Sequence, residues 1–206
     1  MHNAAKAHTS YSPLLMRTAD NAAFYTALTR AEGMHEISDK AAFGGESPYR
    51  LIRVDGRFEK ADDDEFEIAL IDDAESSVAY YDKVTVVHLP EISSRRIAHS
   101  RIWRSASYRH SLALRDILQK VLFGHLVQEY DVLISQGPAS WESEFYWYRK
   151  VSCAVEAGLY VYVQDLATEE LRPIPTQSAL NEIQDRSWSG TDEGSLRAFI
   201  SVFPLR

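Results

Sequence analysis

Residues 95–165 contain, in order, RIAHSRIW (96–103), SLALRDILQKVLFGHLVQE (111–129), DVLIS (131–135), ASWESEFYWYRKVSCAVEA (139–157) and LYVYVQ (159–164). The first, third and fifth segments are short and rich in apolar residues, as strands are. The second and fourth are longer and repeat apolar residues at helical spacing. This β-α-β-α-β succession predicts a sheet with parallel strands and with helices packed on its faces.

The chain on either side of this core predicts further strands and helices. Apolar residues recur at helical spacing between Thr18 and Gly33, and a weaker helical pattern covers 176–186. Short apolar stretches separated by polar turns predict strands at 49–54, 66–71, 78–81, 84–89 and 196–203. We therefore expect an α/β protein of the α+β type, with a mixed, largely antiparallel central sheet and helices on both faces.

One domain is expected to hold the whole chain, since 206 residues that are 45% hydrophobic can bury a single core. Its expected parts are a lead-in and helix (1–47), antiparallel strands (48–95), the β-α-β-α-β core (96–165) and a C-terminal extension (166–206).

The net charge of -8 disfavours general binding to nucleic acids, because their phosphates would be repelled. No apolar run approaches the roughly 18 residues of a membrane helix, and the first residues lack the apolar core of a secretory signal. These observations predict a cytoplasmic protein. The single Cys153 excludes an internal disulfide, and the seven histidines show no metal-ligand spacing, so we expect no metal.

The segment RIWRSASYRHS (101–111) leads from a predicted strand into a predicted helix. Backbone N–H groups converge at a helix N-terminus and favour anions. Four arginines add positive charge there: Arg101, Arg104, Arg109 and Arg115. The segment therefore either holds a phosphate or simply caps the helix, with Ser107 or Ser111 as the cap and the arginines paired with carboxylates.

The second helix of the core carries an unusual aromatic load. Its aromatic side chains cannot all face one stripe, so some line a cleft, form an interface or lie on the sheet; they are Trp141, Phe145, Tyr146, Trp147 and Tyr148. A tyrosine at a cleft edge can donate a proton, because its ordinary pKa near 10 keeps it protonated at neutral pH.

Residues 97–165 resemble the acetyl-CoA-binding half of GNAT-like N-acetyltransferases, and the divergent GNAT-like proteins of phages and mobile elements most closely. The resemblance rests on a strand ending in Ser135-Gln136-Gly137, on Phe145-Tyr146-Trp147 and on Gly158-Leu159-Tyr160-Val161-Tyr162. It implies a cleft for acetyl-CoA between the strands 96–103 and 131–135. The implied site comprises Arg104, Ser105, Ala106, Ser107 and Arg109 on the cofactor phosphates, His99 as the base, and Tyr146 or Tyr148 as the acid.

Two functions follow as hypotheses. The first is an acyl-CoA-dependent N-acyltransferase of unknown acceptor. The second is a catalytically inactive GNAT-like scaffold that binds protein, through Trp141 and Trp147, as an accessory or inhibitor protein of a phage or mobile element. The absence of glycine from residues 104–110, where the family's cofactor loop has glycines, favours the second hypothesis.

Overall fold

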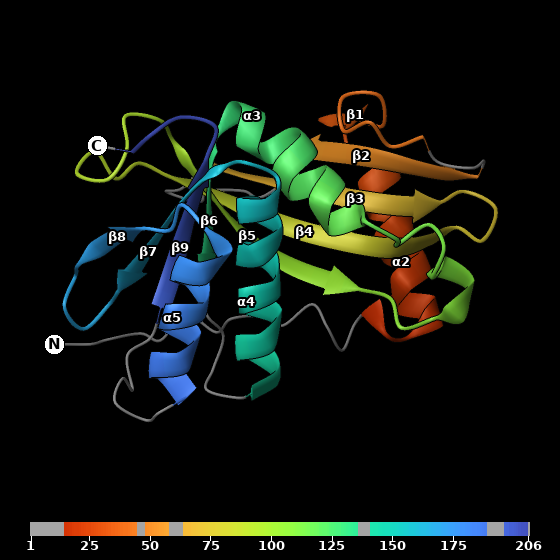
Figure 1. Ribbon diagram of the computed structural model, residues 1–206. Coiled ribbons are helices and arrows are strands. Elements are labelled where there is room, and N and C mark those ends of the chain that lie inside the picture. The colour runs from red at the N-terminus through yellow and green to blue at the C-terminus, as the bar shows by residue number, and fades with distance from the viewer. Residues whose placement is uncertain (1–14, 45–47, 58–63, 136–140, 189–195, 206) are drawn as a thin grey trace, which may run out of the picture.

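The computed structural model describes residues 15–44, 48–57, 64–135, 141–188 and 196–205. Its strands form one sheet in the order β1-β2-β3-β4-β5-β6-β9-β7-β8 (Figure 1). They are β1 (Met34–Glu36), β2 (Tyr49–Asp55), β3 (Asp64–Asp72), β4 (Ser77–Val87), β5 (Ile97–Arg104), β6 (Asp131–Ser135), β7 (Tyr160–Asp165), β8 (Leu171–Pro173) and β9 (Leu196–Ser201). Among these strands β5 and β6 pair in parallel and the other neighbours pair antiparallel, which confirms a mixed, mostly antiparallel sheet.

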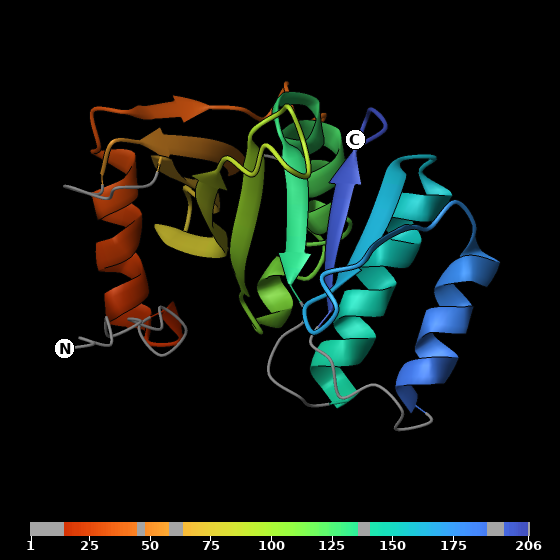
Figure 2. The ribbon, with the colours of Figure 1, turned by 90° about the vertical axis from the view of Figure 1, so that its left-hand side faces the viewer.

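Helices cover both faces of the sheet, as the sequence predicts. Helix α2 (Thr18–Thr29) packs on one face, while α3 (Val127–Glu129) with the preceding helical turns, α4 (Trp141–Glu156) and α5 (Gln177–Trp188) lie on the other (Figure 2). Two apolar layers result. Leu28 of α2 packs with Ile52 and Tyr81 in one layer, whereas Leu122 and Val151 belong to the larger layer under the other helices.

Strand β4 differs from the prediction of two strands, 78–81 and 84–89, separated by a turn at Asp82-Lys83. It is one continuous strand, and Asp82 is fully buried in its middle. Lys83 also lies within the strand, and its amine forms an ion pair with Glu65 of the neighbouring strand β3 at 2.8 Å. The sequence Asp82-Lys83 predicts a turn because charged residues are seldom found inside a buried strand.

The C-terminal segment completes the sheet, where the sequence predicted an extension. Strand β9 lies between β6 and β7, so the predicted parallel strands 131–135 and 159–164 are not neighbours. The short edge strands β1 and β8 were not predicted. At three residues each, they are too short to show a clear alternating pattern.

The predicted helix over 111–129 is irregular. A short 3₁₀ helix (Tyr108–His110) is followed by turns, a π-helical stretch (Gln119–Leu126) and α3. The helical conformation is interrupted at Asp116, whose φ of 58° is left-handed. A regular helical hydrogen bond follows, from the Lys120 N–H to the Asp116 carbonyl at 3.0 Å. Aspartate tolerates this backbone region better than most residues do.

Candidate functional site

Strands β5 and β6 part from each other in the middle of the sheet. Their parallel pairing ends at His99 and Leu133, although β5 continues to Arg104 and β6 to Ser135. Beyond that point a cavity of about 590 Å³ opens between them. Its lining comes from both strands, from α4 and from the segment between β5 and α3: Ile102, Arg104, Ser105, Leu118, Ile134, Ser135, Tyr146, Trp147 and Lys150.

A second cavity of about 360 Å³ lies beside the first and shares Arg104, Leu118, Tyr146 and Lys150 with it. Four cationic side chains line the two cavities, with Asp116 as the one carboxylate on the lining. We call these four the cationic groove: Arg104, Arg115, Arg149 and Lys150. In a chain of net charge -8, such a concentration of positive charge favours an anionic ligand.

The cations of the groove lack carboxylate partners. Within the described part of the chain, no ion pair involves Arg104, Arg115, Arg149 or Lys150, and the Arg104 guanidinium donates to the Leu114 carbonyl at 3.0 Å instead. Several arginines elsewhere are paired with carboxylates: Arg57 binds Glu67 at 2.6 Å and Arg95 binds Asp131 at 2.9 Å. The groove therefore holds uncompensated charge that a bound anion would neutralise.

Lys150, which lines both cavities, and Asp82, which acts on it, both have shifted pKa values. Burial lowers the pKa of the Lys150 amine, and the attraction of Asp82 partly opposes that shift. Burial of Asp82, which has no exposed surface, raises the pKa of its carboxyl group from 3.8 to about 7. Both shifts disfavour the charged forms, and such perturbed groups next to a cavity are typical of functional sites.

The surroundings of Asp82 only partly satisfy its carboxylate. The Tyr80 hydroxyl donates to Oδ2 at 3.3 Å, and proximity to the Ser100 hydroxyl and to the Arg101 backbone N–H lowers the pKa of Asp82, against the effect of burial. Within the described residues, neither Asp82 Oδ1 nor Ser100 Oγ makes a hydrogen bond of normal geometry. The buried carboxyl group has therefore lost its hydrating water without gaining a full set of hydrogen bonds, which destabilises its charged form.

His99 lies at the parting point of β5 and β6 but does not line either cavity. Its Nε2 is 3.2 Å from the Ser135 hydroxyl. Burial, followed by the charge of Arg101, lowers the pKa of the imidazole, which is therefore neutral at neutral pH and can accept a proton.

The predicted cofactor-binding turn is divided between two places. Arg104 and Ser105 line the cavity between β5 and β6, and Ser105 also lines the cavity in which Arg109 lies. Arg109 lines a separate cavity of about 270 Å³ near the start of α2 and pairs with Glu75 at 3.5 Å. Ala106 is exposed, and Ser107, also exposed, lines the cavity near α2.

Backbone amides of this turn already serve protein contacts. The Ser105 N–H donates to the Ala79 carbonyl at 2.9 Å, and the Ser107 N–H donates to the Ser105 hydroxyl at 3.1 Å. Ser107 precedes the 3₁₀ helix but makes no side-chain cap. The amides of Ser105 and Ser107 are thus not aimed at a ligand.

The aromatic residues of α4 point in different directions. Tyr146 is 60% exposed and lines both cavities of the groove. Trp147 and Tyr148 are buried against each other in the core, and the Trp147 indole donates to the Ile134 carbonyl at 3.0 Å. Tyr148 lines none of the three cavities, and the side chain of Trp141 lies outside the described residues.

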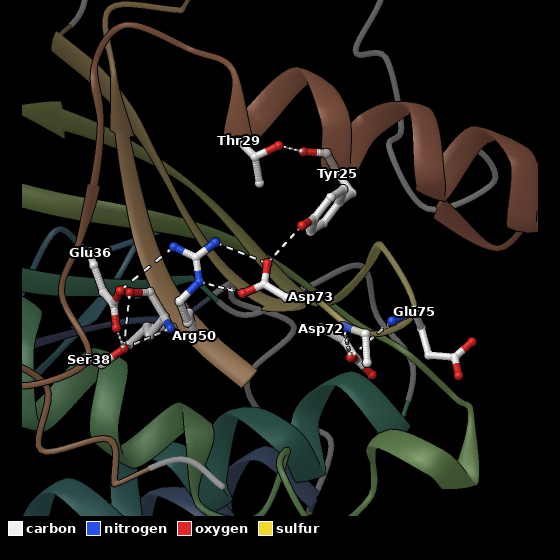
Figure 3. Close-up of polar contacts among 10 residues, drawn as sticks. Tyr25, Thr29, Glu36, Ser38, Arg50, Asp72, Asp73 and Glu75 are labelled. Carbon is white, nitrogen blue, oxygen red and sulfur yellow. Dashed lines mark hydrogen bonds and ion pairs between the residues drawn. The ribbon is translucent and has the colours of Figure 1, made fainter. Parts of the chain in front are cut away.

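A polar network on the α2 side of the sheet is structural in character (Figure 3). Asp73 accepts hydrogen bonds from Tyr25 of α2 at 2.7 Å and from Arg50 of β2 at 2.5 Å. Arg50 also approaches Glu36 of β1 at 3.7 Å. The Arg50 contact lowers the pKa of Asp73. The network fastens α2 to the strands at this edge and does not border the cationic groove.

No group of three or more histidine, cysteine, aspartate or glutamate residues in the described chain is arranged to hold a metal ion. The described helices are also too short or too polar for any of them to cross a bilayer.

Comparison with known proteins found no matching family model, no matching curated protein and no matching solved structure.

Sequence reasoning missed Lys150, Arg149 and Asp82. The first two continue the aromatic run of α4, and their relation to Arg104 and Arg115 requires the packing of α4 against the segment before α3. Asp82 carried a signal in its position, because it interrupts an apolar run that reads as a strand on both sides. Burying an acid at such a position is costly unless it is paired or hydrogen-bonded, so its presence there points to a special environment.

Proposed function

We propose that the protein is an acyl-CoA-dependent N-acyltransferase whose donor binds where β5 and β6 part. The observation that carries this proposal is the cavity of about 590 Å³ between the two strands for which the GNAT-like resemblance predicted a cleft. The adjoining cationic groove supports it, because coenzyme A carries several phosphates.

The groove, more than the turn, suits the phosphates of the donor. Arg115 and Arg149 are exposed and line the second cavity, so their guanidinium groups can reach a phosphate from solvent. Arg104 and Lys150 line both cavities and would link the phosphate end of the donor to its thioester end. Arg109 lies in another cavity and takes no part in this arrangement.

The transfer step needs a base and an acid. The acceptor amine attacks the thioester carbonyl carbon, the C–S bond breaks, the amine loses a proton and the thiolate gains one. We assign proton donation to Tyr146, which borders both cavities, in preference to the buried Tyr148. His99 remains the proposed base for an amine that enters at the end of β6, since its imidazole is neutral and adjoins Ser135.

The second candidate function, a protein-binding scaffold without activity, is favoured by one specific observation. Several large apolar side chains near the groove's helices are solvent-exposed: Tyr108 (83%), Leu112 (58%) and Phe145 (52%). Trp147, which the sequence suggested for this role, is 2% exposed and cannot reach a partner in this structure.

Calorimetric titration with acetyl-CoA and with coenzyme A tests the donor site. The wild-type protein is expected to bind in the micromolar range, and Arg149→Ala is expected to weaken binding about tenfold, since a charge-assisted contact to phosphate is lost. Arg109→Ala is the matched control, because Arg109 is an exposed arginine outside the groove, and it should leave the affinity unchanged. Absence of heat from the wild type, or equal losses in both variants, would refute the proposed site.

A further inference from the structure

Lys150 occupies the place where the two cavities of the groove meet. It is half-buried on α4 and lines both of them. Its amine therefore lies within reach of any ligand that spans the cavities. An amine in such a place is a nucleophile whenever it is unprotonated.

The surroundings of Lys150 shift the pKa of its amine below the ordinary lysine value. Burial lowers its pKa, with Asp82 as the attraction that opposes the shift, and no carboxylate of the described residues pairs with it within 4.0 Å. Of the groups on other elements, Asp82 of β4 acts on the Lys150 amine. The polar and titratable residues that share the lining of the two cavities with Lys150 are Arg104, Ser105, Arg115, Asp116, Gln119, Ser135, Tyr146, Arg149 and Cys153. Three of these are arginines, which offer the ammonium no attraction.

We propose that Lys150 is itself an acyl acceptor, taking the acyl group from a thioester held in the cavity between β5 and β6. This inference rests on the proposed function for the identity of the donor. The Lys150 nitrogen forms an amide bond with the acyl carbon, the C–S bond breaks, and the proton released by the amine passes to the departing thiolate.

Acylation of Lys150 would change the groove in two ways. The amide is neutral, so the groove would keep three of its four cationic side chains. The acyl group would also occupy part of the cavity between the strands. Both effects weaken the binding of a second donor molecule, so the modification limits the protein's own activity.

Mass spectrometry after incubation with acetyl-CoA tests the inference. Peptide mapping should find acetylation at Lys150 in the wild type, and Lys150→Arg should abolish that peptide's modification. Lys83→Arg is the matched control: the Lys83 ammonium is held by Glu65 at 2.8 Å, so its replacement should leave Lys150 labelling unchanged.

A small thioester, S-acetyl-N-acetylcysteamine, separates this inference from the proposed function. Labelling of Lys150 by the small thioester but not by acetyl-CoA would keep Lys150 as the acceptor and remove coenzyme A from the proposed function. No labelling of Lys150 by either donor, under conditions that label the exposed Lys40, would overturn the inference.

The pH dependence of labelling by the small thioester gives a second readout. The rate at Lys150 should reach half its maximum at lower pH than the rate at the lysine of a short unstructured peptide. Asp82→Asn should move the Lys150 midpoint lower still, because it removes the charge that raises the Lys150 pKa. A Lys150 midpoint equal to that of the peptide lysine, or one that does not respond to Asp82→Asn, would overturn the inference.

Discussion

Replacing Asp82 by asparagine is expected to stabilise the protein at alkaline pH. Burial raises the pKa of the Asp82 carboxyl from 3.8 to about 7 in the folded protein. The folded state therefore keeps this proton through a pH window in which the unfolded chain has released it. As pH rises through that window, the folded state loses stability relative to the unfolded chain.

The size of the effect follows from the shift. Three pKa units at about 1.4 kcal/mol each give a cost of about 4 kcal/mol once Asp82 is ionised in both states. Between about pH 5 and about pH 8, the wild type should lose about 2.5 kcal/mol relative to Asp82→Asn, which cannot ionise. For a chain of this length that is a difference of about 5–10 °C in the melting temperature.

Thermal unfolding followed by circular dichroism at the two pH values measures this difference. Asp131→Asn is the matched control, because Asp131 is equally buried but pairs with Arg95 at 2.9 Å. That variant should be destabilised by about 3–5 kcal/mol at neutral pH, since it leaves a charge without its partner. If Asp82→Asn is destabilised at about pH 8 as strongly as Asp131→Asn, the reasoning about Asp82 is refuted.

Two further predictions concern the packing that holds the sheet and the site. Gly33→Ala should destabilise the fold by more than about 2 kcal/mol in chemical denaturation, because a Cβ there would lie 2.1 Å from the Asp55 carbonyl oxygen; Gly44→Ala, with nothing within 4 Å, should be neutral, and equal effects would contradict this. Trp147→Phe should lose the hydrogen bond to the Ile134 carbonyl and unfold at a free energy lower by about 1–3 kcal/mol, whereas unchanged stability would show that the bond contributes nothing.

The sequence was sufficient for elements with a strong local pattern. The strand predicted at 131–135 has the same bounds as β6, because a short continuous apolar run with polar residues at both ends is typical of a buried strand. The helix predicted over 139–157 and the strand predicted over 159–164 lie close to α4 and β7, because helical spacing marks the first and a short apolar run the second. Helices on both faces also followed from the pattern.

Features that depend on tertiary contacts were not predictable. The irregular winding before α3 depends on the left-handed Asp116 and on π-helical turns, which have no sequence pattern of their own. The position of β9 between β6 and β7 is set by pairing across long sequence separation. The cationic groove likewise arises only when α4 packs beside the segment that leads to α3.

The most direct test of the central claim is a crystal structure of the protein with coenzyme A. The proposed function predicts the thiol end of the ligand between Ile102 of β5 and Ile134 of β6, with its phosphates against Arg115 and Arg149. Coenzyme A found on the Arg109 side of the turn, or a cavity between β5 and β6 that stays without ligand at saturating concentration, would contradict it.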